Sequence, residues 1–457
     1  MEPTTTRTRA ETRTLSSMKH GWLNWTIIAA LLLGTLFGEL VLYAGAEAIG
    51  PDHWTRVAGE YVLIRPLKML IIPLILFSVV SGVCSIGDPS RLGLVGGATV
   101  FYYMATMAIA VTIGATLVTL IQPGDLDAET AANLTGQAEA QYQDSSAASR
   151  IEAANEGEKD SLGGAWKNIL DQLIPTSAFG EMSKGNPLSV IVVSLLVGIA
   201  LAMGGDKAKP ARDFFTSMFD TLMRIVGWVI MLTPIGVFFL MAWTVGSIGL
   251  VNLTGPLALY VGTVLTGLLT HGLIVLPVIL FIFGRTNPIK YLVQVRRALM
   301  TAFATDSSSA TMPVTLTETV ESGGCSKKAS NFVIPLGATV NMDGTALYEA
   351  VATVFLFQVF GIDLSIGDLV IVVITATLAA VGAAGIPGAG LVTMVIVIGA
   401  VNTSLAGRGV EPLPLYAIGI ILGIDRIVDM CRTTVNVWGD AVGAKIMTRI
   451  APDEVAT

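Results

Sequence analysis

Long apolar runs separated by short polar segments recur along almost the whole chain. Runs near the length that a helix needs to cross a bilayer begin at about residues 22, 59, 93, 186, 216 and 253, and two more occupy about 331–359 and 414–442. Two further apolar stretches, about 299–322 and 366–405, are interrupted, by Asp306-Ser307-Ser308-Ser309 and by a Gly/Pro-rich turn at 385–390. The pattern predicts an all-α polytopic membrane protein.

Composition supports this class. Of the 457 residues, 53% are hydrophobic and only 13% are charged, so the bilayer is the expected solvent. The three cysteines and three histidines lie far apart in the sequence, which gives no spacing typical of a zinc site or a disulfide framework. We expect a multi-pass protein of the plasma membrane, or of the cytoplasmic membrane if bacterial, with no nucleic-acid partner and no organic cofactor.

The basic residues predict the orientation of the chain. They gather in the N-terminal tail, in short loops near 207–212, 285–297 and 327–328, and at 445–449. The segment 123–164 carries nine acids against two bases. Because loops rich in Lys and Arg stay in the cytoplasm, both termini are expected inside and the acidic segment outside, as a flexible loop. Arg56 and Arg65 are exceptions in an outer loop.

This orientation forces both interrupted stretches to re-enter the membrane. Arg296-Arg297 and Lys327-Lys328 flank the first stretch and both lie inside, so the chain between them must enter and return on one side. The second stretch must do the same from the outside. Irregular backbone at membrane depth is tolerated where it lines a cavity or is buried in protein. The last third therefore predicts an inverted repeat with a binding site at its midplane.

The last apolar run carries a polar face. Asp425, Asp429, Arg432, Asn436 and Asp440 follow one another at spacings of four, three, four and four, which places them on one side of a helix. The guanidinium of Arg432 offers a fork for a carboxylate, Asp429 can bind an ammonium, and Asp440 can coordinate a hard cation. The alternative, in which Asp429 and Arg432 only neutralise each other, leaves Asn436 and Asp440 unexplained.

The preceding run and the two interruptions add further groups. Asn341 and Asp343 are oxygen donors beside glycines that can free backbone carbonyls, as in the Na⁺ sites of broken transporter helices. Hydrogen bonding between helices is the alternative reading of these two residues. The Ser307–Ser309 turn offers N–H groups that favour an anion, and the Gly/Pro turn offers mobile backbone suited to a gate.

Four motifs carry a family resemblance. They are Ser307-Ser308-Ser309-Ala310-Thr311-Met312-Pro313, Asn341-Met342-Asp343-Gly344-Thr345, Ala384-Gly385-Ile386-Pro387-Gly388-Ala389-Gly390 and Asp429-Met430-Cys431-Arg432-Thr433-Thr434-Val435-Asn436. From about residue 22 to 447 the chain resembles the dicarboxylate/amino acid:cation symporter family, which holds excitatory amino acid transporters, neutral amino acid exchangers and prokaryotic glutamate and aspartate transporters. Within the family, we expect a prokaryotic glutamate/aspartate transporter similar to the excitatory amino acid transporters. The resemblance implies eight spans, two oppositely oriented re-entrant hairpins, a homotrimer and a transport domain that moves like an elevator against a scaffold.

The implied segments follow the apolar runs. They are a cytoplasmic tail at 1–21, scaffold helices at 22–92 and 186–252, transport-domain helices at 93–122 and 253–298, an acidic outer loop at 123–185, re-entrant hairpins at 299–330 and 366–405, the seventh and eighth helices at 331–365 and 406–447, and a second tail at 448–457.

The resemblance also implies site residues. The substrate shell would comprise Ser308, Thr345, Ile386, Gly390, Asp429, Arg432, Thr433 and Asn436, with Asp429 on the amino group and Arg432 on the side-chain carboxylate. One Na⁺ site would use Gly337, Asn341, Asn436 and Asp440, a second the backbone of Thr339, Ala380, Val381 and Ala383, and a third Tyr103, Thr106, Asn341 and Asp343. Met107 departs from the family here, because many relatives have a hydroxyl residue at that position.

Glu349 is the expected proton-coupling residue. It follows Asn341 by eight residues and so faces the same core, where a lone carboxylic acid can carry a proton. The excitatory transporters, which this chain resembles, have Glu at the position as their suspected proton carrier, whereas archaeal aspartate transporters have Gln. K⁺ counter-transport follows by the same analogy. The alternative is a neutral Glu that only forms hydrogen bonds.

Asp306 fits neither arrangement of the family. Archaeal members have an Arg at this tip, near the acid equivalent to Asp429, and excitatory transporters have a second Arg at the position of Met430. Here the tip carries an acid and the last helix carries an extra base, Arg426. The pattern predicts an ion pair between Asp306 and Arg426. The alternative is that Asp306 points to cytoplasmic water.

The sequence thus predicts a symporter, not an enzyme, that takes up glutamate or aspartate with Na⁺ and H⁺. A neutral amino acid or C4-dicarboxylate carrier of the same family and an uncoupled anion channel remain as alternatives. Arg432 argues against neutral substrates, and Asp429 argues against dicarboxylates without an amine. An intramembrane hydrolase built on Ser307–Ser309 is disfavoured, because the last third of the chain has no histidine or lysine beside them except near loops.

Overall fold

The computed structural model describes residues 25–43, 49–50, 52–86, 89–143, 170, 174–184, 186–248, 257–381, 385 and 387–453. Within these ranges the regular elements are helices and none is a strand, which confirms an all-α chain. Among the described residues, five helices are long and apolar enough to cross a membrane, or six if the pair Gly205–Ile230 and Thr233–Ser247 forms one bent span. The chain is therefore embedded in a membrane.

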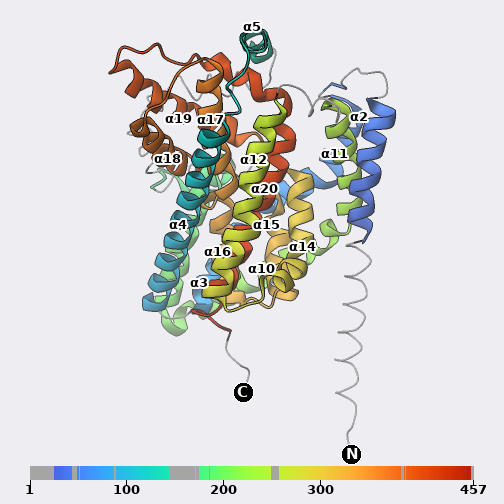
Figure 1. The fold of residues 1–457 in the computed structure, drawn as a ribbon. Helices are drawn as coiled ribbons and strands as arrows, with labels where there is room; N and C mark the ends of the chain where they lie inside the picture. Colours follow the sequence, from blue (N-terminus) through green and yellow to red (C-terminus); the bar gives the residue numbers. More distant parts are fainter. Residues whose placement is uncertain are drawn as a thin grey trace, which may run out of the picture. The chain divides into compact units, whose positions relative to one another are not determined.

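The chain divides into two compact units, each treated by itself. The first combines the residues up to Pro66 with Ile225–Leu250. Its helical segment Trp25–Leu42, α2 (Trp54–Gly59) and η2 (Glu60–Ile64) pack against α11 (Thr233–Ile248), and Figure 1 shows α2 and α11 side by side. Many side chains of this unit are large, apolar and exposed, as in Leu32, Leu36 and Leu40, which suits a surface that faces lipid.

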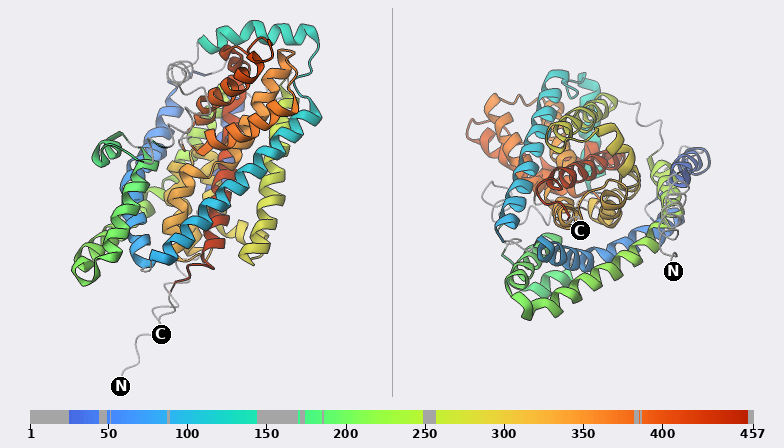
Figure 2. Two further views of the ribbon diagram at one scale, coloured as in Figure 1. Left: turned by 90° about the vertical axis from the view of Figure 1, so that its left-hand side faces the viewer. Right: turned by 90° about the horizontal axis from the view of Figure 1, so that it is seen from below.

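The second unit holds Leu67–Arg224 and Val251–Thr457. Its first half contains α3 (Arg65–Ile86, mostly in this unit), α4 (Pro89–Ile121), α9 (Pro187–Met203) and most of α10 (Lys209–Ile230). Its second half is built around α20 (Gly419–Met447), which other helices of the unit surround in the view from below (Figure 2). The helices that contact α20 include α4, α12 (Ala258–Thr270), α14 (Pro288–Thr305), α15 (Ser308–Glu321), α16 (Lys327–Val340) and α17 (Asp343–Val359).

Helices α14 and α15 form the first of two helix pairs. Asp306 ends α14 in the left-handed conformation, at φ 55°, and Ser307 caps α15 by accepting the Ala310 N–H at 3.1 Å. The sequence predicted that this pair begins near residue 299. In the structure it begins at Pro288. The early start has a local cause, because Asn287 accepts the Lys290 N–H and Pro288 occupies the first helical position.

The second pair consists of α18 (Ile366–Val381) and α19 (Ala389–Ala406), which pack together. Asp368 joins the two helices at the ends away from the turn. Its carboxylate accepts hydrogen bonds from Ser404 Oγ at 2.8 Å and from Arg408 Nη2 at 2.5 Å. Because both hydrogen bonds are made by a buried carboxylate, they hold the two helices together.

The apolar run at about 331–359 is broken near Asn341, as predicted. Helix α16 ends at Val340 and α17 begins at Asp343, and the residues between them, Asn341 and Met342, have non-helical dihedrals. Backbone groups at such a break leave the regular ladder of helical hydrogen bonds, so they can serve a ligand.

The prediction that the acidic segment is a flexible loop was wrong for part of it. Helix α5 occupies Ala128–Gln143 and packs against α20 and η8 (Leu415–Ile418). Asp127 caps this helix, because its carboxylate accepts the Thr130 N–H at 2.9 Å and the Thr130 hydroxyl at 2.7 Å. The alanine-rich stretch that follows favours a helix despite its charge.

Candidate functional site

The polar face predicted for the last apolar run lies on α20 and is buried. Asp425, Asp429, Arg432, Asn436 and Asp440 are all buried, and Arg432 is only 1% exposed. Burying a charge is costly unless it is paired, so the partners of these five side chains define the site.

Arg432 is paired on two sides. Its Nε donates to Asp429 Oδ1 at 2.5 Å, and its Nη1 lies 3.5 Å from Asp425 Oδ1. The guanidinium carbon also lies 4.3 Å from the ring centre of Tyr348 on α17, a distance typical of a cation–π contact. Asp429 and Arg432 therefore do form the ion pair that the alternative reading predicted.

Asp429 reaches beyond its own helix. Its Oδ2 accepts the Gly388 N–H at 2.7 Å, and its Oδ1 accepts the Thr433 hydroxyl at 3.4 Å. Gly390 lies so close to Arg432 that a Cβ would come 2.7 Å from Nη1. The turn of the second helix pair thus contacts both charged groups.

The turns of the two helix pairs also meet each other. Gly385 O accepts the Ser309 N–H at 3.1 Å and the Ser307 hydroxyl at 2.6 Å. Ser308, between them, is buried. Ile386, predicted for the substrate shell, lies outside the described residues. The structure brings together the two segments that the sequence assigned to an anion site and to a gate.

Asn436 and Thr345 contact each other across α20 and α17. Asn436 Nδ2 donates to Thr345 Oγ1 at 3.1 Å, and Asn436 Oδ1 accepts the Gly344 N–H at 2.7 Å. These bonds dock the first turn of α17 on α20. The predicted shell residues that the structure describes thus gather around one stretch of α20.

One turn further along α20, the residues predicted for the first cation site also converge. Asn341 Nδ2 donates to Asp440 Oδ1 at 3.0 Å, and the Asn341 N–H donates to Gly337 O at 2.9 Å. Gly337 lies against Asp440, because a Cβ on it would overlap that carboxylate. Oxygen atoms of this kind are the ligands of hard cations.

Two residues predicted for the third cation site reach Asn341 and its surroundings. The Thr106 hydroxyl donates to Asn341 Oδ1 at 3.5 Å, and the Tyr103 hydroxyl donates to Val333 O at 2.8 Å. Asp343 is fully buried and contacts His271 of η6 (His271–Val275), with 3.1 Å between Asp343 Oδ2 and His271 Nε2. Met107 is fully buried and adds no oxygen.

The second predicted cation set stays a prediction. Thr339 donates its hydroxyl to Leu336 O at 3.0 Å, which leaves its backbone as the candidate ligand. Ala380 is buried near the end of α18, Val381 ends that helix, and α16 contacts α18. Ala383 lies outside the described residues.

Glu349 is fully buried on α17, and its Oε1 accepts a hydrogen bond from the hydroxyl of Thr393 on α19. Its Oε2 has no hydrogen-bond partner among the residues that the structure describes. The acid predicted to carry protons therefore links α17 to the second helix pair.

Sequence reasoning missed three contributors, namely Tyr348, Thr393 and His271. Each contacts a predicted residue that is distant in the chain, so its helical spacing gave no signal. Tyr348 stands beside Glu349 in the sequence, and its aromatic ring was the only available hint of a partner for a buried arginine.

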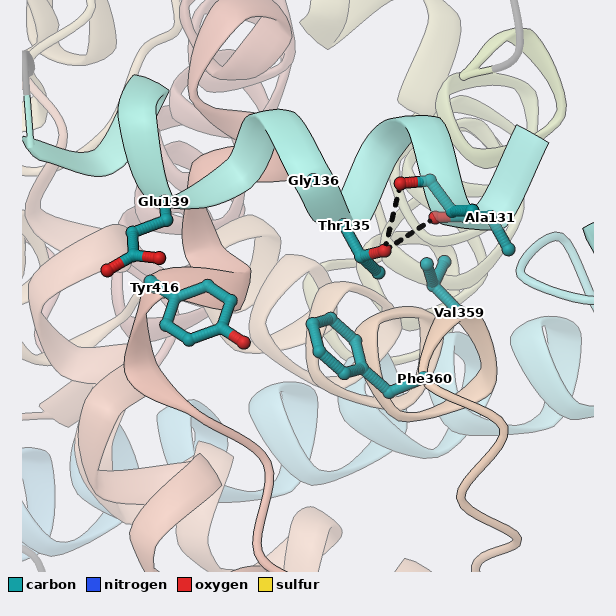
Figure 3. A pocket seen from close by; sticks show the side chains of 8 residues that line it. Ala131, Thr135, Gly136, Glu139, Val359, Phe360 and Tyr416 are labelled. Carbon is teal, nitrogen blue, oxygen red and sulfur yellow. Dashed lines mark hydrogen bonds between the residues drawn. The ribbon is translucent and has the colours of Figure 1, made fainter. Parts of the chain in front are cut away.

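A surface hollow of about 580 Å³ lies apart from these groups. Figure 3 shows Thr135 and Glu139 of α5 facing Val359, Phe360 and Tyr416 across it, with the Thr135 hydroxyl bonded to its own helix backbone. None of the predicted site residues lines it.

Comparisons with known proteins show the family of the chain. Residues 23–450 match the sodium:dicarboxylate symporter family. The chain is 36% identical to excitatory amino acid transporter 3 of Mus musculus over 96% of its length and 87% of the relative's. It is 35% identical to a putative sodium-dependent excitatory amino acid transporter of Caenorhabditis elegans, covering 93% of this chain and 90% of the relative. It is also 35% identical to excitatory amino acid transporter 1 of Ambystoma tigrinum, covering 96% of this chain and 84% of the relative.

These proteins are transporters rather than enzymes, and their likeness extends through every segment that builds the site. The chain belongs to the sodium:dicarboxylate symporter family.

Proposed function

We propose that this protein is a secondary active symporter that takes up acidic amino acids, glutamate or aspartate, together with Na⁺. The observation that carries the proposal is the buried pair of Arg432 and Asp429, which the turns of both helix pairs contact or adjoin. The names of the relatives support the same substrate class.

The pair gives each end of an amino acid a partner. A substrate ammonium binds Asp429, and the side-chain carboxylate takes the fork of Arg432, displacing Asp425 and Asp429 from it. Because the substrate carries both charges, Asp429 and Arg432 each keep a partner of opposite charge after the exchange. A neutral amino acid would not replace the carboxylates on Arg432, and a dicarboxylate without an amine would leave Asp429 unpaired.

The Na⁺ sites lie next to this pair along α20. The first uses Gly337, Asn341, Asn436 and Asp440, the second the backbone near Thr339 and the end of α18, and the third Tyr103, Thr106, Asn341 and Asp343. Asn436 and Asn341 supply the coupling, because Asn436 also holds Thr345 in the substrate shell and Asn341 contacts Asp440. Na⁺ bound here orders the break between α16 and α17 and so shapes the substrate shell.

Glu349 carries a proton with the substrate, and K⁺ returns the unloaded protein. The support is its complete burial and its contact with Thr393 of the second helix pair. A protonated Glu349 is neutral and can be buried at low cost, whereas the ionised form requires a cation beside it.

The remaining architecture is proposed on the same basis. Eight spans and two re-entrant hairpins form a homotrimer whose transport domains move like elevators against a scaffold of 22–92 and 186–252, with both termini in the cytoplasm. The described residues of the first compact unit, 25–66 and 225–248, fall within that scaffold range, whereas 67–92 and 186–224 belong to the second unit. The second helix pair acts as the outer gate, since its turn contacts Asp429 and the turn of the first pair.

The test is uptake of radiolabelled glutamate and aspartate into proteoliposomes, with Na⁺, H⁺ and K⁺ gradients imposed one at a time. We expect accumulation above equilibrium only with an inward Na⁺ gradient. Entry that stops at equilibrium under every gradient would instead identify a channel.

A further inference from the structure

His271, which is outside the predicted site residues, forms a fully buried pair with Asp343 of the third Na⁺ set. His271 Nε2 lies 3.1 Å from Asp343 Oδ2, and both side chains are 0% exposed. His271 begins η6, 72 positions before Asp343 at the start of α17. The sequence treated the three histidines as unrelated, so this contact was not expected.

Each partner keeps one polar atom unused. Asp343 Oδ1 and His271 Nδ1 have no hydrogen-bond partner among the residues that the structure describes. A buried carboxylate oxygen without a partner costs free energy, and a hard cation is the ligand that would use it. The oxygen belongs to the same acid that the third Na⁺ set contains.

The neighbours of the pair fix its geometry. Gly439 of α20 lies against it, because a Cβ there would come 2.8 Å from both Asp343 Oδ2 and Asn341 Nδ2. Trp438 Nε1 donates to Gly272 O at 2.9 Å, which ties α20 to the residue after His271. The Tyr102 hydroxyl donates to Gly439 O at 2.9 Å. Helix α20 therefore sets the distance between His271 and Asp343.

We propose that His271 is a positioning residue for the third Na⁺ site, an inference that rests on the proposed function. Its Nε2–H donates to Asp343 Oδ2, which fixes the carboxylate and leaves Oδ1 for the cation. Carboxylates that ligate a metal are themselves held by hydrogen bonds from outer partners, and His271 is such a donor to Asp343. A neutral imidazole suits the task better than a lysine, because a lysine would bring a positive charge that competes with Na⁺.

Three substitutions separate positioning from helix packing. In His271→Gln the amide nitrogen reaches the place of Nε2, so a donor to Asp343 is retained. In His271→Asn the amide is similar but too short, since its nitrogen falls near Nδ1. In His271→Leu the volume is approximately kept and the donor is lost. The Gln and Asn variants form a matched pair that differs only in reach.

The readout is Na⁺ binding to the purified protein in the absence of substrate. Binding is measured by Trp fluorescence and by the Na⁺ dependence of the melting temperature. We expect the Na⁺ concentration at half-saturation to rise about 10- to 100-fold in the Leu and Asn variants, as for other lost outer partners. The Gln variant should stay within about threefold of wild type. At saturating Na⁺ the substrate KM of the Gln, Asn and Leu variants should match wild type.

Three results would overturn the inference. Unchanged Na⁺ affinity in the Leu and Asn variants would mean that His271 only packs. Equal impairment of the Gln and Asn variants would mean that the donor position does not matter. A wild-type protein without any Na⁺-dependent signal would overturn the proposed function and this inference with it, whereas the first two results leave the proposed function standing.

Discussion

Asp306 and Arg426 form an ion pair between the turn of the first helix pair and α20, with 3.5 Å between Asp306 Oδ2 and Arg426 Nη1. The Asp306 side chain is only 1% exposed, which rules out the alternative that it points to cytoplasmic water. The expected pair is confirmed. It matters because Asp306 also lies within electrostatic range of Asp429 and Arg432, the two groups proposed to bind the substrate.

We predict that Asp306 and Arg426 are coupled in substrate binding. Asp306→Asn and Arg426→Gln should each weaken glutamate affinity, and the double variant should be less impaired than the sum of the two. A double-mutant cycle on uptake KM measures this coupling, which we expect to be about 0.5–3 kcal/mol for groups in contact. Strict additivity would mean that the ion pair plays no part in binding.

A second prediction concerns selectivity. Arg432→Cys leaves the substrate carboxylate unpaired in a buried site, where losing one partner of a charge pair costs about 2–5 kcal/mol. Uptake of glutamate and aspartate should disappear, and exchange of alanine or serine should appear. Arg432→Lys keeps the charge but loses the fork and should fall between the two. Acidic substrate affinity that survives in the Cys variant would refute the assignment of Arg432.

Asp440 should determine the response to Na⁺. Asp440→Asn keeps the size of the side chain but removes the charge that attracts the cation. We expect a Na⁺ requirement at least about tenfold higher, with substrate KM near wild type at saturating Na⁺. Uptake measured across a Na⁺ series tests this. A wild-type Na⁺ dependence would assign Asp440 to structure, through its bond with Asn341.

Glu349 should determine the response to a proton gradient. If the Glu349 carboxyl is protonated on the outside and releases the proton inside, a lower outer pH should accelerate wild-type uptake. The Glu349→Gln side chain is permanently neutral, so uptake by this variant should not respond to outer pH. Uptake at fixed Na⁺ with the outer pH varied measures the difference. Thr393→Val is the control, because it removes the hydrogen bond to Glu349 but keeps the acid. A pH response that persists in Glu349→Gln would exclude the proton role.

Gly385 should limit closure of the two turns. A Cβ there would overlap Ser309 Oγ and Ala338 O, so Gly385→Ala should separate the two turns. The hydrogen bonds to Gly385 O would then be lost, and the substrate KM should rise about tenfold or more. Gly262→Ala is a matched control, since its Cβ would meet nothing within 4 Å. If both variants transport like wild type, the contact between the turns does not close the site.

Local patterns in the sequence predicted most of the helices and the side chains that share a helix face. Periodicity placed Asp425 to Asp440 along one side of α20. The loop charges and the two interruptions predicted both helix pairs, and the glycines beside Asn341 predicted the break there. Such features depend on neighbours three or four residues away, so they are written in local spacing. The boundary at Pro288 and helix α5 were missed, because capping by Asn287 and Asp127 outweighed hydropathy there.

Most contacts between polar groups of different helices become visible only in the packed structure. The bond from Ser307 to Gly385 joins residues 78 positions apart, and the contact of His271 with Asp343 joins residues 72 positions apart. Tyr348 reaches Arg432 from another helix. No helical period relates such pairs. Packing brings them into contact because each buried charge or polar atom must find a partner once water is excluded.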